Sequence, residues 1–271
     1  MDIKNPACNA PGEMHRGDRG ILYRRWKAPS PKTVMLLVHG IGANSLWWGS
    51  FSEFFLRSGI SSYAIELAEY GSFGVYSKDI LSLHGIIRKE NPGKDIFLVG
   101  ESMGAVISLL ILTARPDKAC GLICLSPALK SALNFAIRDY FAIFAPLLYN
   151  PQKKFVMPYD ISMCTRDEDH IKRAKEEGAG DISATSRVLF DIVVAQIRLR
   201  ISKNKFNGPV LFLIPERDAI IDSDATRRFF EKLKSPDKTL IEYPGMYHSI
   251  SIDIGKEFVF RDILRWLEDR L

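Results

Sequence analysis

The sequence predicts an α/β protein in which a mostly parallel central sheet is flanked by helices and carries an inserted helical cap. Two observations support this fold class. Short apolar segments rich in β-branched residues alternate with longer amphipathic segments along most of the 271-residue chain, a pattern typical of a parallel sheet covered on both faces. The alternation stops between residues 127 and 207, where helical patterns continue without a convincing buried strand.

Seven apolar segments are expected to form the sheet. The first is expected to be an outer strand. In chain order the segments are Arg19–Trp26, Thr33–His39, Ser61–Leu67, Asp95–Gly100, Cys120–Ser126, Val210–Pro215 and Thr239–Tyr243.

Four amphipathic segments between these strands and one after the last strand are expected to be helices that cover the sheet. They are Trp48–Arg57, Val75–Lys89, Met103–Ala114, Ser223–Lys234 and Lys256–Arg270. Residues 1–126 and 208–271 together therefore make up the predicted core.

Residues 127–207 make up the predicted helical cap. Leu133–Tyr149 is unusually rich in aromatic and aliphatic residues. Arg166–Glu177 has a charged helical pattern that ends in the glycines of residues 178–180, and Ser183–Ile201 predicts a second amphipathic helix. We expect this insertion to lie over the sheet.

Composition excludes several classes of protein. The 37 Lys and Arg exceed the 32 Asp and Glu and give a net charge of +5, but no run of basic residues is longer than a pair, so the stripe typical of nucleic-acid binding is missing. The four cysteines have no histidine cluster beside them, which favours free thiols and no metal. The sequence has neither a signal-peptide h-region nor an apolar stretch long enough for a membrane span, which predicts a cytoplasmic location.

The strongest functional motif is Gly100-Glu101-Ser102-Met103-Gly104, which lies between a predicted strand and a predicted helix. A sharp strand-to-helix turn holds the serine in a strained backbone conformation, and small flanking residues relieve the crowding around it. The helix N-terminus directs backbone N–H groups toward the exposed hydroxyl. Ser102 is therefore the predicted nucleophile.

A serine hydroxyl needs a general base, and His248 follows the last predicted strand. His15, His84 and His170 are better explained as surface or packing residues. His39 is expected to be a buried support for the loop that contains it.

The imidazole needs an acid that fixes its tautomer, and Asp218 follows the strand Val210–Pro215. Asp222 and Asp224 are nearby alternatives, although Asp222 is better explained as the N-cap of the following helix. The order of serine, aspartate and histidine along the chain is the order found in α/β-hydrolases.

The oxyanion of an acyl-transfer reaction needs two backbone donors. His39-Gly40-Ile41-Gly42 follows a buried strand, where this architecture places one donor, so the predicted pair is the N–H groups of Ile41 and Met103. Such donors contribute about 3 kcal/mol to lowering the acylation barrier.

The segments LLVHGIGANS, LVGESMGA, PERDAIID and EYPGMYHSI make the chain, from about Tyr23 onward, resemble the monoglyceride lipase and lysophospholipase branch of the α/β-hydrolase superfamily, of the serine aminopeptidase S33 type. The resemblance implies the α/β-hydrolase fold, esterase activity on monoacylglycerol-like or lysolipid-like substrates beneath a helical cap, and no cofactor. One turn differs: Glu66–Phe73 replaces the usual Asp-x-Arg-Gly-His-Gly-x-Ser, and only Gly71 survives.

The expected reaction is hydrolysis of a lipid-like carboxylic ester through an acyl-enzyme intermediate. Five apolar cap residues are candidates for binding the acyl chain, although packing of the cap onto the core explains them equally well: Phe135, Phe141, Phe144, Leu147 and Leu148. The cap is also expected to contact a membrane surface transiently. The alternatives are a small-ester carboxylesterase, an amidase or peptidase, and a non-catalytic binding protein.

Overall fold

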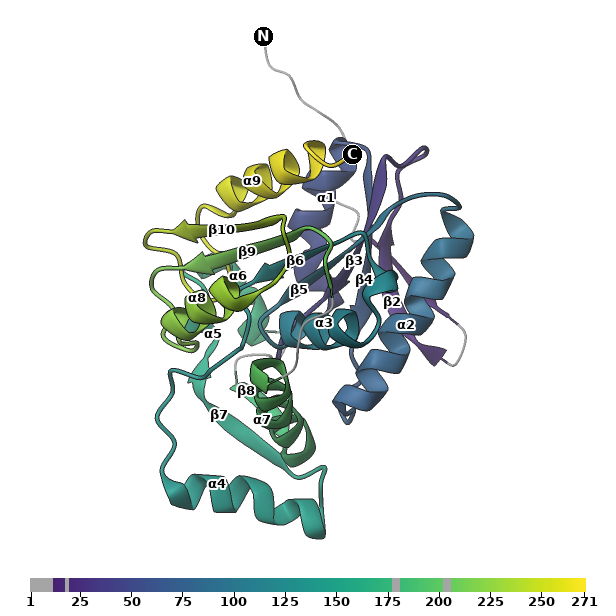
Figure 1. Ribbon diagram of the computed structural model, residues 1–271. Coiled ribbons are helices and arrows are strands. Elements are labelled where there is room, and N and C mark those ends of the chain that lie inside the picture. The colour runs from purple at the N-terminus through teal and green to yellow at the C-terminus, as the bar shows by residue number, and fades with distance from the viewer. Residues whose placement is uncertain (1–11, 18–19, 177–180, 202–205) are drawn as a thin grey trace.

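A computed structural model describes residues 12–17, 20–176, 181–201 and 206–271 of the chain. In this part of the chain one sheet runs through the molecule in the strand order β1-β2-β4-β3-β5-β6-β9-β10 (Figure 1). The strands are β1 (Glu13–Arg16), β2 (Leu22–Trp26), β3 (Thr33–Val38), β4 (Ile60–Glu66), β5 (Ile96–Glu101), β6 (Gly121–Leu125), β9 (Val210–Pro215) and β10 (Lys238–Tyr243).

The sheet is mostly parallel, as predicted. Neighbouring strands from β4 to β10 in this order pair in parallel, whereas β2 pairs antiparallel with both β1 and β4. The residues of β3 and β5 are all buried, which explains why both strands are nearly continuous apolar runs. The strand β1 was not predicted, because its sequence EMHR is polar and mostly exposed.

Helices cover both faces of the sheet (Figure 1), with α1 and α9 on one face and α2, α3 and α8 on the other. Each face has its own apolar core. Phe51 and Phe55, one turn apart on α1, pack with Phe260 of α9. The bounds are α1 (Gly49–Arg57), α2 (Phe73–Glu90), α3 (Met103–Ala114), α8 (Ser223–Lys232), α9 (Lys256–Glu268) and the short 3-10 helices η2 (Ser45–Trp48) and η3 (Pro116–Lys118).

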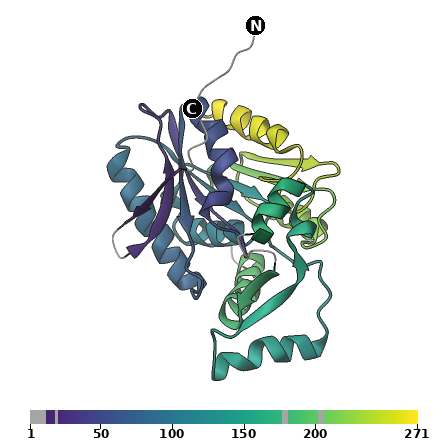
Figure 2. The same ribbon diagram turned by 180° about the vertical axis from the view of Figure 1, so that it is seen from behind.

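The chain between β6 and β9 forms the insertion. It contains α4 (Ile137–Phe144), η4 (Ala145–Leu148), β7 (Lys154–Asp160), α5 (Ile161–Cys164), α6 (Glu168–Glu176), β8 (Asp181–Thr185) and α7 (Ser186–Ile201). Figures 1 and 2 both show α4 standing away from the sheet, at the far end of the insertion. The boundaries at residues 127 and 207 stay a prediction.

The insertion is less purely helical than expected, because β7 and β8 pair as an antiparallel hairpin. The strand β7 was missed because Pro158 interrupts its apolar pattern, and a proline counts against a strand. The first residues of the predicted helix Ser183–Ile201 belong to β8 instead. Glu177 and the predicted glycine stop at residues 178–180 lie outside the described residues, as does Cys8.

Within the described ranges, none of the helices has the length and apolar character that a membrane span requires.

Candidate active site

The turn between β5 and α3 holds Ser102 in a strained conformation, as predicted from the sequence. Its φ of 55° and ψ of −117° lie in a region that L-residues rarely adopt. Hydrogen bonds stabilise the turn, because the Ser102 N–H donates to Leu125 O and its carbonyl accepts from the N–H of Ala128. The turn therefore places Ser102 directly after the carboxyl end of β5 and before the first residue of α3.

The glycines around Ser102 lie where the neighbouring backbone leaves no room for a side chain. A Cβ on Gly100 would lie 2.5 Å from Ala105 N, and one on Gly104 would lie 2.1 Å from Val38 O. A Cβ on Gly40 would lie 3.0 Å from the Cβ of Ser102. The motif therefore reflects close backbone approach as well as turn geometry.

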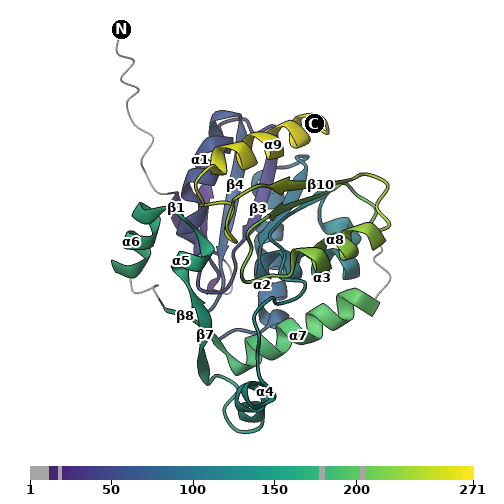
Figure 3. The ribbon, with the colours of Figure 1, turned by 90° about the vertical axis from the view of Figure 1, so that its left-hand side faces the viewer.

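The structure brings Ser102, His248 and Asp218 together at the carboxyl edge of the sheet. His248 Nε2 lies 2.9 Å from Ser102 Oγ, and His248 Nδ1 lies 2.8 Å from Asp218 Oδ2. Because the carboxylate only accepts, Nδ1 carries the proton and donates to it, which leaves Nε2 to accept from the hydroxyl. Figure 3 looks toward this edge, to which β9 and β10 point.

Asp218 is held in place by the loop that follows β9. Its Oδ1 accepts hydrogen bonds from the N–H groups of Ile220 and Ile221, both at 2.9 Å. Asp222 instead accepts from the N–H of Ala225 and caps α8. The structure therefore places Asp218 beside His248, whereas Asp222 caps α8 and the third candidate, Asp224, pairs with Arg227.

The charged groups around His248 favour the protonated form of its imidazole. Burial alone lowers the pKa of this imidazole, but the charge and hydrogen bond of Asp218, with a further contribution from the Glu101 carboxylate, more than offset burial and raise the pKa above its ordinary value. Burial in turn raises the pKa of Glu101, although both oxygens of Glu101 accept hydrogen bonds from Ser251. Glu101, which directly precedes the serine in the GxSxG motif, is thus a second acid beside the histidine, which the sequence did not indicate.

The predicted oxyanion donors are the backbone N–H groups of Ile41 and Met103, and both residues line a cavity next to the serine turn. No described residue accepts a hydrogen bond from either group. His39 supports this loop, as expected, since its Nδ1 donates to Gly40 O and its Nε2 accepts from the N–H of Leu67. Both predicted donors are therefore available to an oxyanion.

This cavity has a volume of about 290 Å³ and opens beside residues 39–42, which we call the oxyanion loop. Core residues Glu66–Glu69 line one side and β8 lines another, with Lys154 of β7 between them. The Lys154 ammonium forms an ion pair with Glu69 and lies over the ring of Tyr70. Two features that the family pattern did not predict therefore line this cavity. One is the turn Glu66–Phe73, and the other is the hairpin of β7 and β8.

The five cap residues proposed to bind an acyl chain do not line this cavity. Phe141 and Leu148 are 73% and 92% exposed, and Phe135, Phe144 and Leu147 are only partly buried. They lie in or next to α4, at the far end of the insertion, whereas the hairpin of β7 and β8 lies beside the oxyanion loop. This position explains why they do not line the cavity. Their contact with an acyl chain stays a prediction that this geometry does not support.

Two interactions that fix the histidine loop were missed from the sequence. The Ser126 hydroxyl donates to the carbonyl of His248. The fully buried Asp253 accepts from the N–H of Tyr247 and pairs with the guanidinium of Arg166, which lies in the insertion. Neither belongs to a recognisable motif, because each depends on contacts between segments far apart in the chain.

Among the described residues, no group of histidine, cysteine and acidic side chains is gathered closely enough to hold a metal ion.

A parallel sheet whose central strand ends in a strained serine, hydrogen-bonded through a histidine to an aspartate beyond a later strand, defines an α/β-hydrolase. Comparison with known families is more specific. The model of the family described as serine aminopeptidase, S33, matches residues 29–255. The chain belongs to this family.

Relatives match over nearly the full chain. The monoglyceride lipase of Homo sapiens is 26% identical over 288 residues, which cover 98% of this chain and 92% of the relative. The crystal structure of a monoacylglycerol lipase from Paleococcus ferrophilus has a TM-score of 0.81 and 26% identity, covering 91% of this chain and 98% of that one. A soluble variant of monoglyceride lipase from Saccharomyces cerevisiae, in complex with a substrate analog, also has a TM-score of 0.81, at 18% identity, and covers 99% of this chain and 97% of its own.

Proposed function

We propose that the protein is a serine esterase that hydrolyses carboxylic esters of lipid-like substrates, such as monoacylglycerols or lysophospholipids. The observation that carries the proposal is the continuous hydrogen-bond chain from Ser102 through His248 to Asp218. Nearly full-length similarity to a monoglyceride lipase and a monoacylglycerol lipase supports the lipid ester as the substrate class.

In the first half of the reaction, Ser102 Oγ attacks the ester carbonyl while His248 Nε2 takes the hydroxyl proton. The N–H groups of Ile41 and Met103 stabilise the oxyanion that forms. His248 then gives the proton to the leaving alcohol, and the acyl group stays on Ser102.

In the second half, His248 takes a proton from water, which attacks the acyl-enzyme carbonyl. The same two N–H groups stabilise the second oxyanion, and its collapse returns the proton to Ser102 and releases the carboxylic acid. Asp218 stays ionised throughout and stabilises the imidazolium that forms in each half.

The cavity beside the oxyanion loop suits the polar part of such an ester. Glu66, Glu69, Lys154 and Asp181 line it together with hydroxyl side chains of β8, and these groups can hydrogen-bond a polyol or a charged head group. Its volume of about 290 Å³ is at the small end for ligand pockets. That size also favours a small-ester carboxylesterase as the second candidate function.

Outward-facing apolar side chains of the insertion support transient contact with a membrane surface, through which a lipid substrate would be reached. Ile137 and Phe141 of α4, Leu148 of η4 and Val156 of β7 are all more than two-thirds exposed. Burying such side chains in the acyl boundary of a bilayer is favourable. The cytoplasmic location stays a prediction from the sequence.

The experiment is to measure kcat/KM on monoacylglycerols, lysophospholipids and p-nitrophenyl esters of graded chain length, with Ser102→Ala as the control. We expect a fluorophosphonate probe to label Ser102, labelling to be lost in Ser102→Ala, and the decanoate to be hydrolysed more efficiently than the acetate. Labelling of another residue would contradict the nucleophile. A preference for acetate would contradict the lipid substrate and favour the small-ester alternative.

A further inference from the structure

A second cavity, of about 480 Å³, lies between the C-terminal half of α7, helix α8 and the segment after β6. It shares no lining residue with the cavity beside Ser102. The helix α7 extends between them, since Val188 near its start lines the first cavity and Leu199 near its end lines the second. The second cavity is called the basic cleft here because of the charges around it.

Five cations and no acidic side chain are among the residues that line the basic cleft: Lys130, Arg200, Arg228, Lys232 and Lys234. All five are exposed at its rim. The whole chain has a net charge of only +5, so this is a local concentration of positive charge. Positive charges held this close together attract an anion and repel one another in its absence.

One nearby carboxylate, Asp222, offsets only part of the charge of the five rim cations. Asp222 pairs with Lys130 at 2.7 Å and lies 4.0 Å from Arg228. The adjacent Arg227, by contrast, is paired with both Asp224 and Glu242. Two neighbouring arginines of α8 thus differ: Arg227 pairs closely with two carboxylates, whereas Arg228 has only the longer contact with Asp222 and lines the basic cleft.

The floor of the basic cleft is apolar. Leu129, Leu199 and Leu233 are buried in the core, and Phe229 lies beside them. An apolar floor under a cationic rim is complementary to an amphiphile with a negative head. Arg228 and Lys232 are one helical turn apart on α8, so both can reach a single anionic group.

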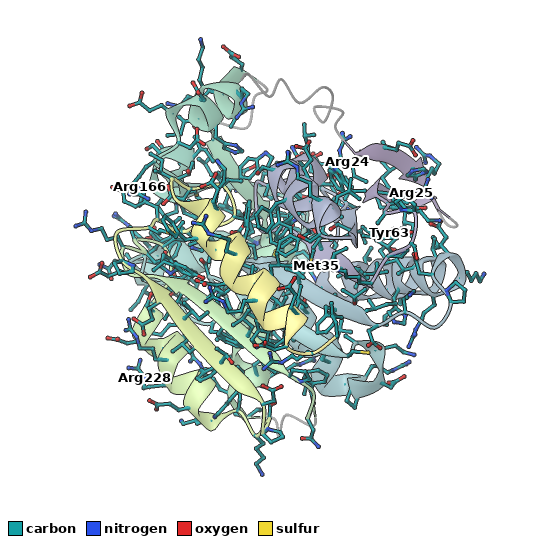
Figure 4. The ribbon with its side chains drawn as sticks, turned by 90° about the horizontal axis from the view of Figure 1, so that it is seen from above. Arg24, Arg25, Met35, Tyr63, Arg166 and Arg228 are labelled. Atoms are coloured by element: carbon teal, nitrogen blue, oxygen red, sulfur yellow. The ribbon has the colours of Figure 1, made fainter. Side chains whose placement is uncertain are left out.

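We propose that the basic cleft binds an anionic amphiphile: one phosphate or carboxylate head group at Arg228 and Lys232, with a short apolar tail on the leucines of the floor. The guanidinium and ammonium groups donate charge-assisted hydrogen bonds to the head, and the tail is removed from water. Figure 4 shows Arg228 at the outer edge of the molecule, far from Arg24 and Arg25 in that view, where a ligand from solution can reach it.

The test is calorimetric titration of the full chain with octyl phosphate below its critical micelle concentration. The other arms are inorganic phosphate, the neutral octyl glucoside, and phosphatidylcholine vesicles with and without phosphatidic acid. We expect octyl phosphate to bind at least about tenfold more tightly than either inorganic phosphate or octyl glucoside, because only it uses both rim and floor. Added salt weakens the binding.

The key variant is the double charge reversal Arg228→Glu with Lys232→Glu, and the matched control is Lys78→Glu with Lys89→Glu on α2. The control makes the same change in net charge at exposed positions outside the cleft. We expect at least about tenfold weaker binding of octyl phosphate in the cleft variant and unchanged binding in the control. Far-ultraviolet circular dichroism shows whether both variants are folded.

Three results overturn the proposal: equal binding of octyl glucoside or inorganic phosphate, octyl phosphate binding that survives the charge reversal, and binding only to vesicles. The last result means that the rim meets a lipid surface and not a single amphiphile. Since the titration needs no catalysis, its outcome is independent of the proposed esterase activity.

Discussion

The carboxyl edge of the sheet and the distal part of the insertion differ in how tightly their side chains are held. At the sheet edge, His248 and Asp218 are almost completely buried and each makes directional hydrogen bonds. At the far end of the insertion, Phe141 and Leu148 are largely exposed. The proposed catalytic side chains thus lie in the buried region, where small displacements are costly, while the distal part of the insertion exposes apolar side chains to solvent.

The largest expected effect concerns Asp218, the acid that orients His248 at the buried sheet edge. Asp218→Asn keeps the acceptor for Ile220 and Ile221 but removes the charge that orients and stabilises the imidazolium. We expect kcat to fall by about 10³-fold or more, measured on a p-nitrophenyl ester.

The matched control is Asp222→Asn, in the same loop. Asn is also a good N-cap, so we expect kcat unchanged and the free energy of unfolding altered by at most about 1 kcal/mol. If the Asp222 variant lost the greater activity, the assignment of the acid would be wrong.

The second prediction concerns close backbone approach at the sheet edge. Gly104→Ala places a Cβ against Val38 O, and a backbone clash cannot be relieved by a rotamer change. We expect a loss of about 1–3 kcal/mol in the free energy of unfolding, together with lower activity, measured by urea denaturation and ester hydrolysis.

Its control is Gly85→Ala within α2, where the added Cβ meets nothing within 4 Å. That change is expected to raise the free energy of unfolding by about 0.5–1 kcal/mol. Equal effects of the two substitutions would show that the packing around Gly104 tolerates a side chain.

The third prediction concerns the pH profile. The general base must be neutral to act, so kcat/KM falls as the pH drops below the pKa of His248, which is raised above its ordinary value. Glu101→Gln removes one of the charges that raise this pKa, so we expect the acidic limb of the profile to move to lower pH. An unmoved limb in a variant that keeps its plateau activity would mean that Glu101 has only a structural role.

The smallest effect on the folded state is expected at the distal insertion. Phe141→Ser with Leu148→Ser should change the free energy of unfolding by less than about 0.5 kcal/mol per substitution and leave small-ester hydrolysis intact. We expect weaker co-sedimentation with phosphatidylcholine vesicles, whereas Phe258→Ser, which removes a 63% exposed aromatic side chain from α9, should not weaken it. Equal losses in both would point to nonspecific adsorption.

The same contrast explains how much could be predicted from the sequence. The bounds of α3 and β9 were predicted to the residue, because a buried strand and a buried helix have strong apolar patterns. Ser102, Asp218 and His248 could be found because each follows a strand, and the fold brings strand ends together.

What could not be predicted depends on contacts between distant segments. The ladder of β7 and β8 is partly exposed and contains Pro158, so neither strand has a buried apolar run. The pairing of Asp253 with Arg166 joins the histidine loop to the insertion without a motif. Periodicity reports burial along one element, and it does not report which loops meet.

One contact makes the oxyanion loop depend on the insertion. Gly42 has a φ of 72°, and a Cβ there would lie 2.9 Å from the side chain of Ile182 on β8. The isoleucine therefore occupies the space that the missing side chain leaves. An engineered replacement of the insertion must therefore supply a side chain of similar volume next to Gly42. Without it, the loop that carries the Ile41 amide loses its packing contact with the insertion.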